Sequence, residues 1–125
     1  MANSRLSESD DLLPRPPLSE VVHVVGLDTH RELFVALMGA YDQAATGKGK
    51  ERHASDGENF EDQQIVQFGR WMGSAHFQCG QAAKKALESC RLPADAAIQE
   101  LYGVINYAAA AIIIRRSELS KVSPK

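Results

Sequence analysis

A basic, glycine-containing segment at residues 47–53, with the sequence GKGKERH, carries the residue types best suited to binding chemistry. Its glycines allow the backbone to approach a ligand closely. Its side chains that can donate hydrogen bonds to a phosphate are Lys48, Lys50, Arg52 and His53. The spacing differs from that of a P-loop, and no strand is predicted before it. The segment is therefore predicted to be either an anion-binding loop or a solvated basic loop.

A second candidate is the acidic segment at residues 60–64, FEDQQ. Acidic residues are favoured in the first turn of a helix because they complement the positive end of the helix dipole. Glu61 and Asp62 are thus expected simply to mark a helix start, and a catalytic carboxylate is the alternative.

Polar residues on two neighbouring predicted helices form the third candidate. The short link at Leu92 to Ala94 predicts that these helices pair as an antiparallel hairpin. One polar set would then face the other: Gln81, Lys84, Lys85 and Glu88 against Glu100, Asn106 and Tyr107. A buried Asn106 needs partners, since an unpaired buried amide costs about 1–3 kcal/mol. We name Gln81, Lys84 and Asn106 as candidate ligand-binding residues. The alternative is a structural polar pair that sets the register of the helices or a dimer interface.

Histidine and cysteine spacings do not match a metal site, and no catalytic residue, cofactor or metal is predicted. Cys79 and Cys90 are expected on one helix, about 16 Å apart along its axis. A disulfide requires Cα atoms within about 7 Å, so both are predicted to be free, buried thiols. Trp71 is predicted to lie in the core.

The longest apolar run is residues 98–114, IQELYGVINYAAAAIII. Because it is apolar on nearly all sides, we predict a buried central helix, continuing to about Ser117. The run is shorter than the roughly 20 apolar residues that a membrane span needs, so no membrane contact is predicted. Its apolar surface is wider than short amphipathic helices can cover. We therefore predict a homo-oligomer, in which a second copy of the chain covers the rest.

Three shorter helices are expected before it. The first begins at Asp28 or Thr29, where Thr29 and Glu32 have capping-box spacing, and ends at Gly47. The second runs from residues 58–59 to Gly73, and the third from residue 75 to 91. Ser74 is predicted to cap the third helix, and small residues including Gly80 predict close packing along it. Residues 21–25, VVHVV, are left open between a short strand and an extended arm.

The chain of 125 residues is expected to form one domain, and its formal net charge of −2 gives no general preference for nucleic acid or anionic membranes. We predict an all-α, four-helix bundle-like domain over residues 20–117, with a long buried C-terminal helix. Residues 1–19 are predicted to be a disordered tail and residues 118–125 a polar tail. The absence of a signal-peptide pattern predicts a cytoplasmic protein.

The segments GKGKERHA, FEDQQI, GQAAKKALE and ELYGVINYAAA occur in this order within residues 47–114. They resemble segments of small uncharacterised helical proteins of phages and prophages, which implies a phage origin and a site of action in the host cytoplasm. No biochemical activity comes with that resemblance.

The chain is also faintly similar to MazG-like nucleotide pyrophosphohydrolases. The resemblance implies an all-α, oligomeric protein in which an E-x-x-E helix and an E-x-x-D helix hold magnesium. The matching positions here are Lys85 and Glu88, then Glu100 and Gly103. With only two of the four acids and a lysine that repels a cation, the chain departs from the pattern that this hydrolysis needs.

We therefore expect a phage-type accessory protein that binds a nucleotide-like phosphorylated small molecule without catalysis, through the basic loop. One alternative is an inhibitor or adaptor that binds a host protein. A MazG-like pyrophosphohydrolase is the other.

Overall fold

The computed structural model describes residues 24–47 and 57–122, with side-chain environments up to residue 120. The chain divides into two compact units, Met1–Arg31 and Glu32–Lys125. The described part of the first unit forms turns, in which the Leu27 amide donates to the Val24 carbonyl at 3.1 Å. Val24 and Val25 belong to no strand. The rest of the predicted strand or arm, and the predicted tail over residues 1–19, lie outside the described residues.

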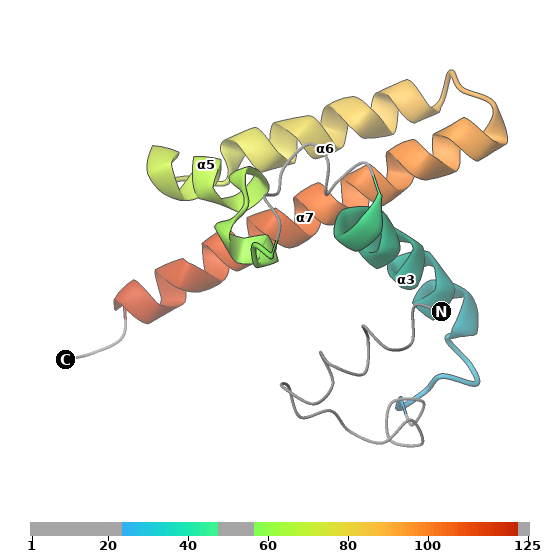
Figure 1. Cartoon of the computed structure of the whole chain (residues 1–125), viewed down its shortest axis with the longest axis horizontal. Coiled ribbons are helices and arrows are strands. Elements are labelled where there is room, and N and C mark those ends of the chain that lie inside the picture. The colour runs from blue at the N-terminus through green and yellow to red at the C-terminus, as the bar shows by residue number, and fades with distance from the viewer. Residues whose placement is uncertain (1–23, 48–56, 123–125) are drawn as a thin grey trace. The chain divides into compact units, whose positions relative to one another are not determined.

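Every regular element in the described residues is helical, which confirms the predicted all-α fold (Figure 1). The elements are α3 (Arg31–Thr46), the 3-10 turn η1 (Phe60–Asp62), α5 (Gln64–Met72), α6 (His76–Ser89) and α7 (Ala94–Val122). The basic segment between α3 and η1 lies outside the described residues from Lys48 onward.

The start of α3 differs from the prediction. It begins at Arg31 rather than at Asp28 or Thr29. The Thr29 hydroxyl donates to the Gly26 carbonyl at 3.1 Å, so it stabilises the preceding turn and makes no capping box. The end agrees with the prediction, because the Gly47 amide closes the last turn on the Gln43 carbonyl at 2.9 Å.

The predicted second helix is split in two. Glu61 and Asp62 lie in η1, and the extended backbone of Gln63, with ψ of 161°, separates η1 from α5. Gly73 ends α5 as predicted, with a φ of 77° that favours glycine. The cap predicted at Ser74 is wrong: Ala75 occupies the cap position, and Ser74 Oγ accepts only a long 3.4 Å bond from the His76 amide.

Helices α6 and α7 form the predicted antiparallel hairpin and lie side by side in Figure 1. The link is short because the amides of Cys90, Arg91 and Leu92 close successive turns at the end of α6. The Ala97 amide then donates to the Pro93 carbonyl at 2.8 Å and starts α7. Helix α7 continues past the predicted end at Ser117, as far as Val122.

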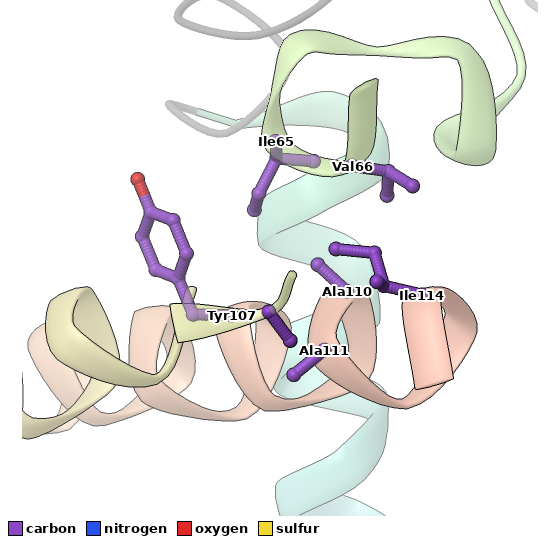
Figure 2. Packing of buried hydrophobic residues seen from close by; sticks show 7 residues of the cluster. Ile65, Val66, Tyr107, Ala110, Ala111 and Ile114 are labelled. Atoms are coloured by element: carbon purple, nitrogen blue, oxygen red, sulfur yellow. The ribbon is translucent and has the colours of Figure 1, made fainter. Parts of the chain in front are cut away.

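The core lies between α5, the beginning of α6 and one side of α7. Figure 2 shows Ile65 and Val66 of α5 above the α7 side chains. The full cluster is Ile65, Val66, Ala75, Tyr107, Ala110, Ala111 and Ile114. Gln78 is completely buried beside it, and its Nε2 donates to the Ile65 carbonyl at 3.0 Å. This amide ties α6 to the first turn of α5.

Within the chain, α7 is buried on one side and exposed on the other. Gly103, Tyr107, Ala110 and Ile114 are buried, whereas Ile112 is 53% exposed. The contacts with α5 and α6 therefore leave part of the apolar surface of α7 uncovered, as expected from its wide apolar surface. By length and composition alone, Ala94–Ser120 could cross a membrane, a test that core helices of soluble proteins also pass. The length argument against a span therefore does not hold, because the helix extends beyond its apolar centre.

Other predicted core positions lie at the surface. Trp71 is 80% exposed, because it follows the buried Val66 by five positions and so points away from α7. Cys79 and Cys90 are free, as predicted, but exposed rather than buried. A Cβ atom added at Gly80 would meet no atom within 4 Å, so close packing does not explain this glycine within the chain.

Candidate ligand-binding cleft

A cleft of about 510 Å³ lies where α3, η1, α6 and α7 come together. Polar side chains make up much of its lining: Asp42, Gln43, Gln63, Lys85, Gln99, Glu100 and Asn106. The lining also includes the aromatic side chains of Phe60, Tyr102 and Tyr107. A neighbouring cleft of about 560 Å³ shares Phe60, Gln63 and Asn106 with the first, so the two are adjacent.

Side-chain amides join α3 to α7 at this cleft. Asn106 Nδ2 donates to the Ala40 carbonyl at 3.0 Å and approaches Gln43 Oε1 at 3.4 Å. Gln43 Nε2 in turn donates to the Gln99 carbonyl at 2.9 Å. The half-buried Asn106 therefore gains the partners that its burial requires, and it gains them from the first helix of the unit.

Close contact between α3 and α7 depends on a glycine. The Tyr102 ring lies directly against Gly39, where an added Cβ would overlap it. Gly39 thus makes room for Tyr102 at the wall of the cleft, and the amide contacts beside it hold the same two helices together.

An ion pair lies at the other wall. Lys85 Nζ is 3.5 Å from Glu100 Oε1, and the two side chains are 15% and 27% exposed. Gly103 leaves room for the Lys85 side chain to reach Glu100, because a Cβ atom at residue 103 would lie only 2.9 Å from Lys85 Cδ. The sequence ELYG therefore supplies both the carboxylate of Glu100 and the space through which the stem of Lys85 passes.

The four segments quoted for the phage resemblance each contribute to the lining of this cleft. GKGKERHA contributes Gly47, and GQAAKKALE contributes Lys85. FEDQQI contributes Phe60, Gln63 and Ile65. ELYGVINYAAA contributes Glu100, Tyr102, Gly103, Asn106 and Tyr107. Segments that are far apart in the sequence thus meet at one place in the fold.

The predicted site residues have different locations. Asn106 lines the cleft, but its hydrogen bonds go to α3 rather than to the polar residues of α6. Lys84 points away, with a side chain 64% exposed and 3.9 Å from Glu88. Gln81 is half-buried on α6 and is not among the lining residues. Lys48, Lys50, Arg52 and His53 lie outside the described residues.

Sequence reasoning missed Gln43, Gln99 and Tyr102. The partners of Gln43 lie 56 and 63 residues further along the chain, so no local spacing indicates the contact. Tyr102 belongs to the apolar run of residues 98–114, and an apolar run does not reveal a cleft.

The acids that match the MazG-like magnesium positions do not form a metal site. Glu100 is paired with Lys85, and Glu88 lies near Lys84. Within residues 24–47 and 57–122, no group of three His, Cys, Asp or Glu side chains could hold a metal ion. An ammonium group beside Glu100 offers a divalent cation repulsion instead of a ligand.

Chemically, the cleft offers amide donors and acceptors, aromatic faces, the carboxylates of Asp42 and Glu100 and the ammonium group of Lys85, which suits binding and orientation of a polar small molecule. No family model, curated protein or solved structure matches this chain, so a functional assignment depends on this geometry.

Proposed function

We propose that this chain is a non-catalytic binder of a phosphorylated small molecule of the nucleotide class, seated in the cleft between α3 and α7. The observation that carries the proposal is the convergence of Gln43, Gln99, Asn106, Tyr102 and Lys85 on one cleft. Its volume of about 510 Å³ is within the range of small-molecule sites. By the phage resemblance, we propose that it acts as an accessory protein in the host cytoplasm.

The amide-rich wall suits a nucleobase. Asn and Gln side chains match the donor and acceptor pattern at the edge of adenine. Each amide has two donor hydrogens and an oxygen with two lone pairs, so the bonds between Asn106, Gln43 and Gln99 leave capacity for a ligand. The Tyr102 ring at the same wall offers a face or edge for stacking.

The cleft also carries groups that suit phosphate. Lys85 supplies a half-buried ammonium group, which is paired with Glu100 in the free protein. Gly47 also lines the cleft, and the chain continues from it into Lys48, Lys50, Arg52 and His53. All four follow Gly47 within six positions in the sequence. They remain our predicted phosphate ligands.

Calorimetry against a panel of nucleoside mono-, di- and triphosphates, with inorganic phosphate included, tests this proposal. We expect Lys85→Met to weaken nucleotide binding about tenfold or more, because a charge-assisted hydrogen bond contributes about 1.5–3 kcal/mol. Lys84→Met is the matched control, because this neighbouring lysine points away from the cleft. Arg52→Ala and Lys50→Ala test the basic segment, and thermal melts check that each variant folds.

The proposal fails if wild-type protein binds no nucleotide at millimolar concentration. It also fails if Lys84→Met and Lys85→Met weaken binding equally. Magnesium-dependent release of pyrophosphate, lost in Glu100→Ala, would support the MazG-like enzyme instead.

A second candidate function, an inhibitor or adaptor of a host protein, is favoured by an exposed aromatic surface on α5 and α6. The Phe68 ring centroid is 6.0 Å from that of Trp71 and 4.7 Å from that of Phe77. Large exposed aromatic side chains, Trp above all, are enriched at protein interfaces. We expect Trp71→Ala, but not Leu87→Ala on another exposed position, to abolish cross-linking to one defined host protein.

A further inference from the structure

The exposed side of α7 carries a regular apolar stripe. Its members alternate in steps of three and four residues: Ile98, Leu101, Ile105, Ala108, Ile112 and, one heptad later, Leu119. Ile98 and Leu101 are 46% and 42% exposed, and Leu119 is 72% exposed. The position between Ile112 and Leu119 in this series is occupied by Arg115, which is charged and also exposed. This is the heptad spacing by which one helix packs along another.

The stripe is separate from the side of α7 that packs inside the chain. The buried positions Gly103, Tyr107, Ala110 and Ile114 lie on the opposite face at 100° per residue. Asn106 and Tyr102, which contact α3, lie between these two faces. Apolar residues scattered singly over a surface are ordinary, but an ordered stripe of this length indicates an interface.

We propose that a second copy of this chain covers the stripe, with the two α7 helices antiparallel about a two-fold axis near Ala108. Ala108 is near the middle of the stripe, and its small side chain allows the helices to approach closely. Pairing about this point brings Ile105 opposite Ile112, and Ile98 opposite Leu119. A two-fold axis requires such a self-complementary surface, since each copy presents the same residues.

Charge selects the antiparallel orientation. The first turn of α7 carries Asp95, and Arg115 and Arg116 lie towards its other end. An antiparallel pair places the acidic beginning of each helix towards the basic end of the other, and it also opposes the two helix dipoles favourably. A parallel pair would bring the Arg115 and Arg116 residues of both copies together, where the Glu118 of each chain, 3.1 Å from its own Arg115, offsets only part of this charge.

Light scattering on the full chain, over a range of concentrations, tests the assembly. We expect wild type to have twice the chain mass of 13.7 kDa, and Ile112→Glu to have the mass of one chain, with self-association weakened at least 100-fold. Val35→Glu on α3 is the matched control, because Val35 and Ile112 are both 53% exposed on helices. Circular dichroism melts show whether each variant is folded.

Cysteine cross-linking tests the orientation, in a Cys79→Ser and Cys90→Ser background. Ala108→Cys is expected to form a disulfide-linked dimer. Ile98→Cys is expected to cross-link with Leu119→Cys in a mixture, and not with itself. Self-linking of Ile98→Cys would overturn the antiparallel arrangement. A monomeric wild type overturns the dimer, and capture of that monomer by phosphatidylglycerol vesicles would assign the stripe to lipid instead.

Discussion

Gly69 and Gly80 give the sharpest test of the packing, because they are the same residue type in two different helical surroundings. A Cβ added at Gly69 would overlap Ile114 Cδ1 and lie 2.8 Å from the Gln78 amide atoms. Ile114 and Gln78 are both buried, so they have little room to move. A Cβ added at Gly80 would meet nothing within 4 Å.

The expected effects of alanine have opposite signs. Overpacking a core costs about 1–3 kcal/mol, and replacing a helical glycine by alanine returns up to about 1 kcal/mol. Gly69→Ala should therefore lower the free energy of unfolding by about 1–2 kcal/mol. Gly80→Ala gains helix propensity without overpacking, so it should raise the free energy of unfolding by about 0.5–1 kcal/mol. At about 4 °C per kcal/mol for a domain of this size, the melting temperatures separate by roughly 6–12 °C.

Urea titration, followed by circular dichroism at 222 nm as the standard helix signal, measures both free energies under one set of conditions. Equal effects of the two substitutions would refute the packing of Ile114 and Gln78 against Gly69. Destabilisation by Gly80→Ala would show that another molecule covers this face of α6. Restoration of Gly69→Ala by Ile114→Val would support the contact directly.

The remaining predictions concern contacts at the cleft and the thiols. Asn106→Leu removes the bonds to Ala40 and Gln43, so it should cost about 1 kcal/mol and speed hydrogen exchange in α3 more than in α6; equal acceleration in both helices would contradict this. A double-mutant cycle with Lys85→Met and Glu100→Gln should give a coupling of up to about 1 kcal/mol, and zero coupling would mean that the ion pair contributes nothing to stability. Cys79 and Cys90 should both react with a thiol reagent in the folded protein, whereas protection of both would agree with the buried positions predicted from the sequence.

Sequence patterns predicted the helices well where a helix end depends only on contacts between residues close in the sequence. Gly47 and Gly73 end α3 and α5 as predicted, because a glycine needs only the preceding turn to close a helix. The short link before Pro93 likewise predicts the α6–α7 hairpin. The start of α3 differs because the amides of Thr29 and His30 donate to the Gly26 carbonyl, at 3.1 and 2.8 Å, and close a separate turn before the helix begins. A pattern of residue types does not reveal this turn.

Local sequence patterns could not predict which side of each helix is buried, or where the cleft lies. An apolar helix such as α7 contains two apolar faces, and composition does not say which of them its neighbours cover. The wall of the cleft depends on contacts between residues such as Gln43 and Gln99, which are distant in the chain. Asn106 was recognised because a polar residue in an apolar run demands partners, although the partners are on α3 rather than α6.

The exposure of Trp71 has a spectroscopic consequence. It is the sole tryptophan of the chain, and water reaches most of its indole ring in the folded state. Its emission should therefore already resemble that of an unfolded chain and be quenched readily by iodide. Tryptophan fluorescence would then follow the melting of α5 and its core poorly. The same property makes it a sensitive and site-specific reporter of any molecule that comes to cover the aromatic surface around Phe68.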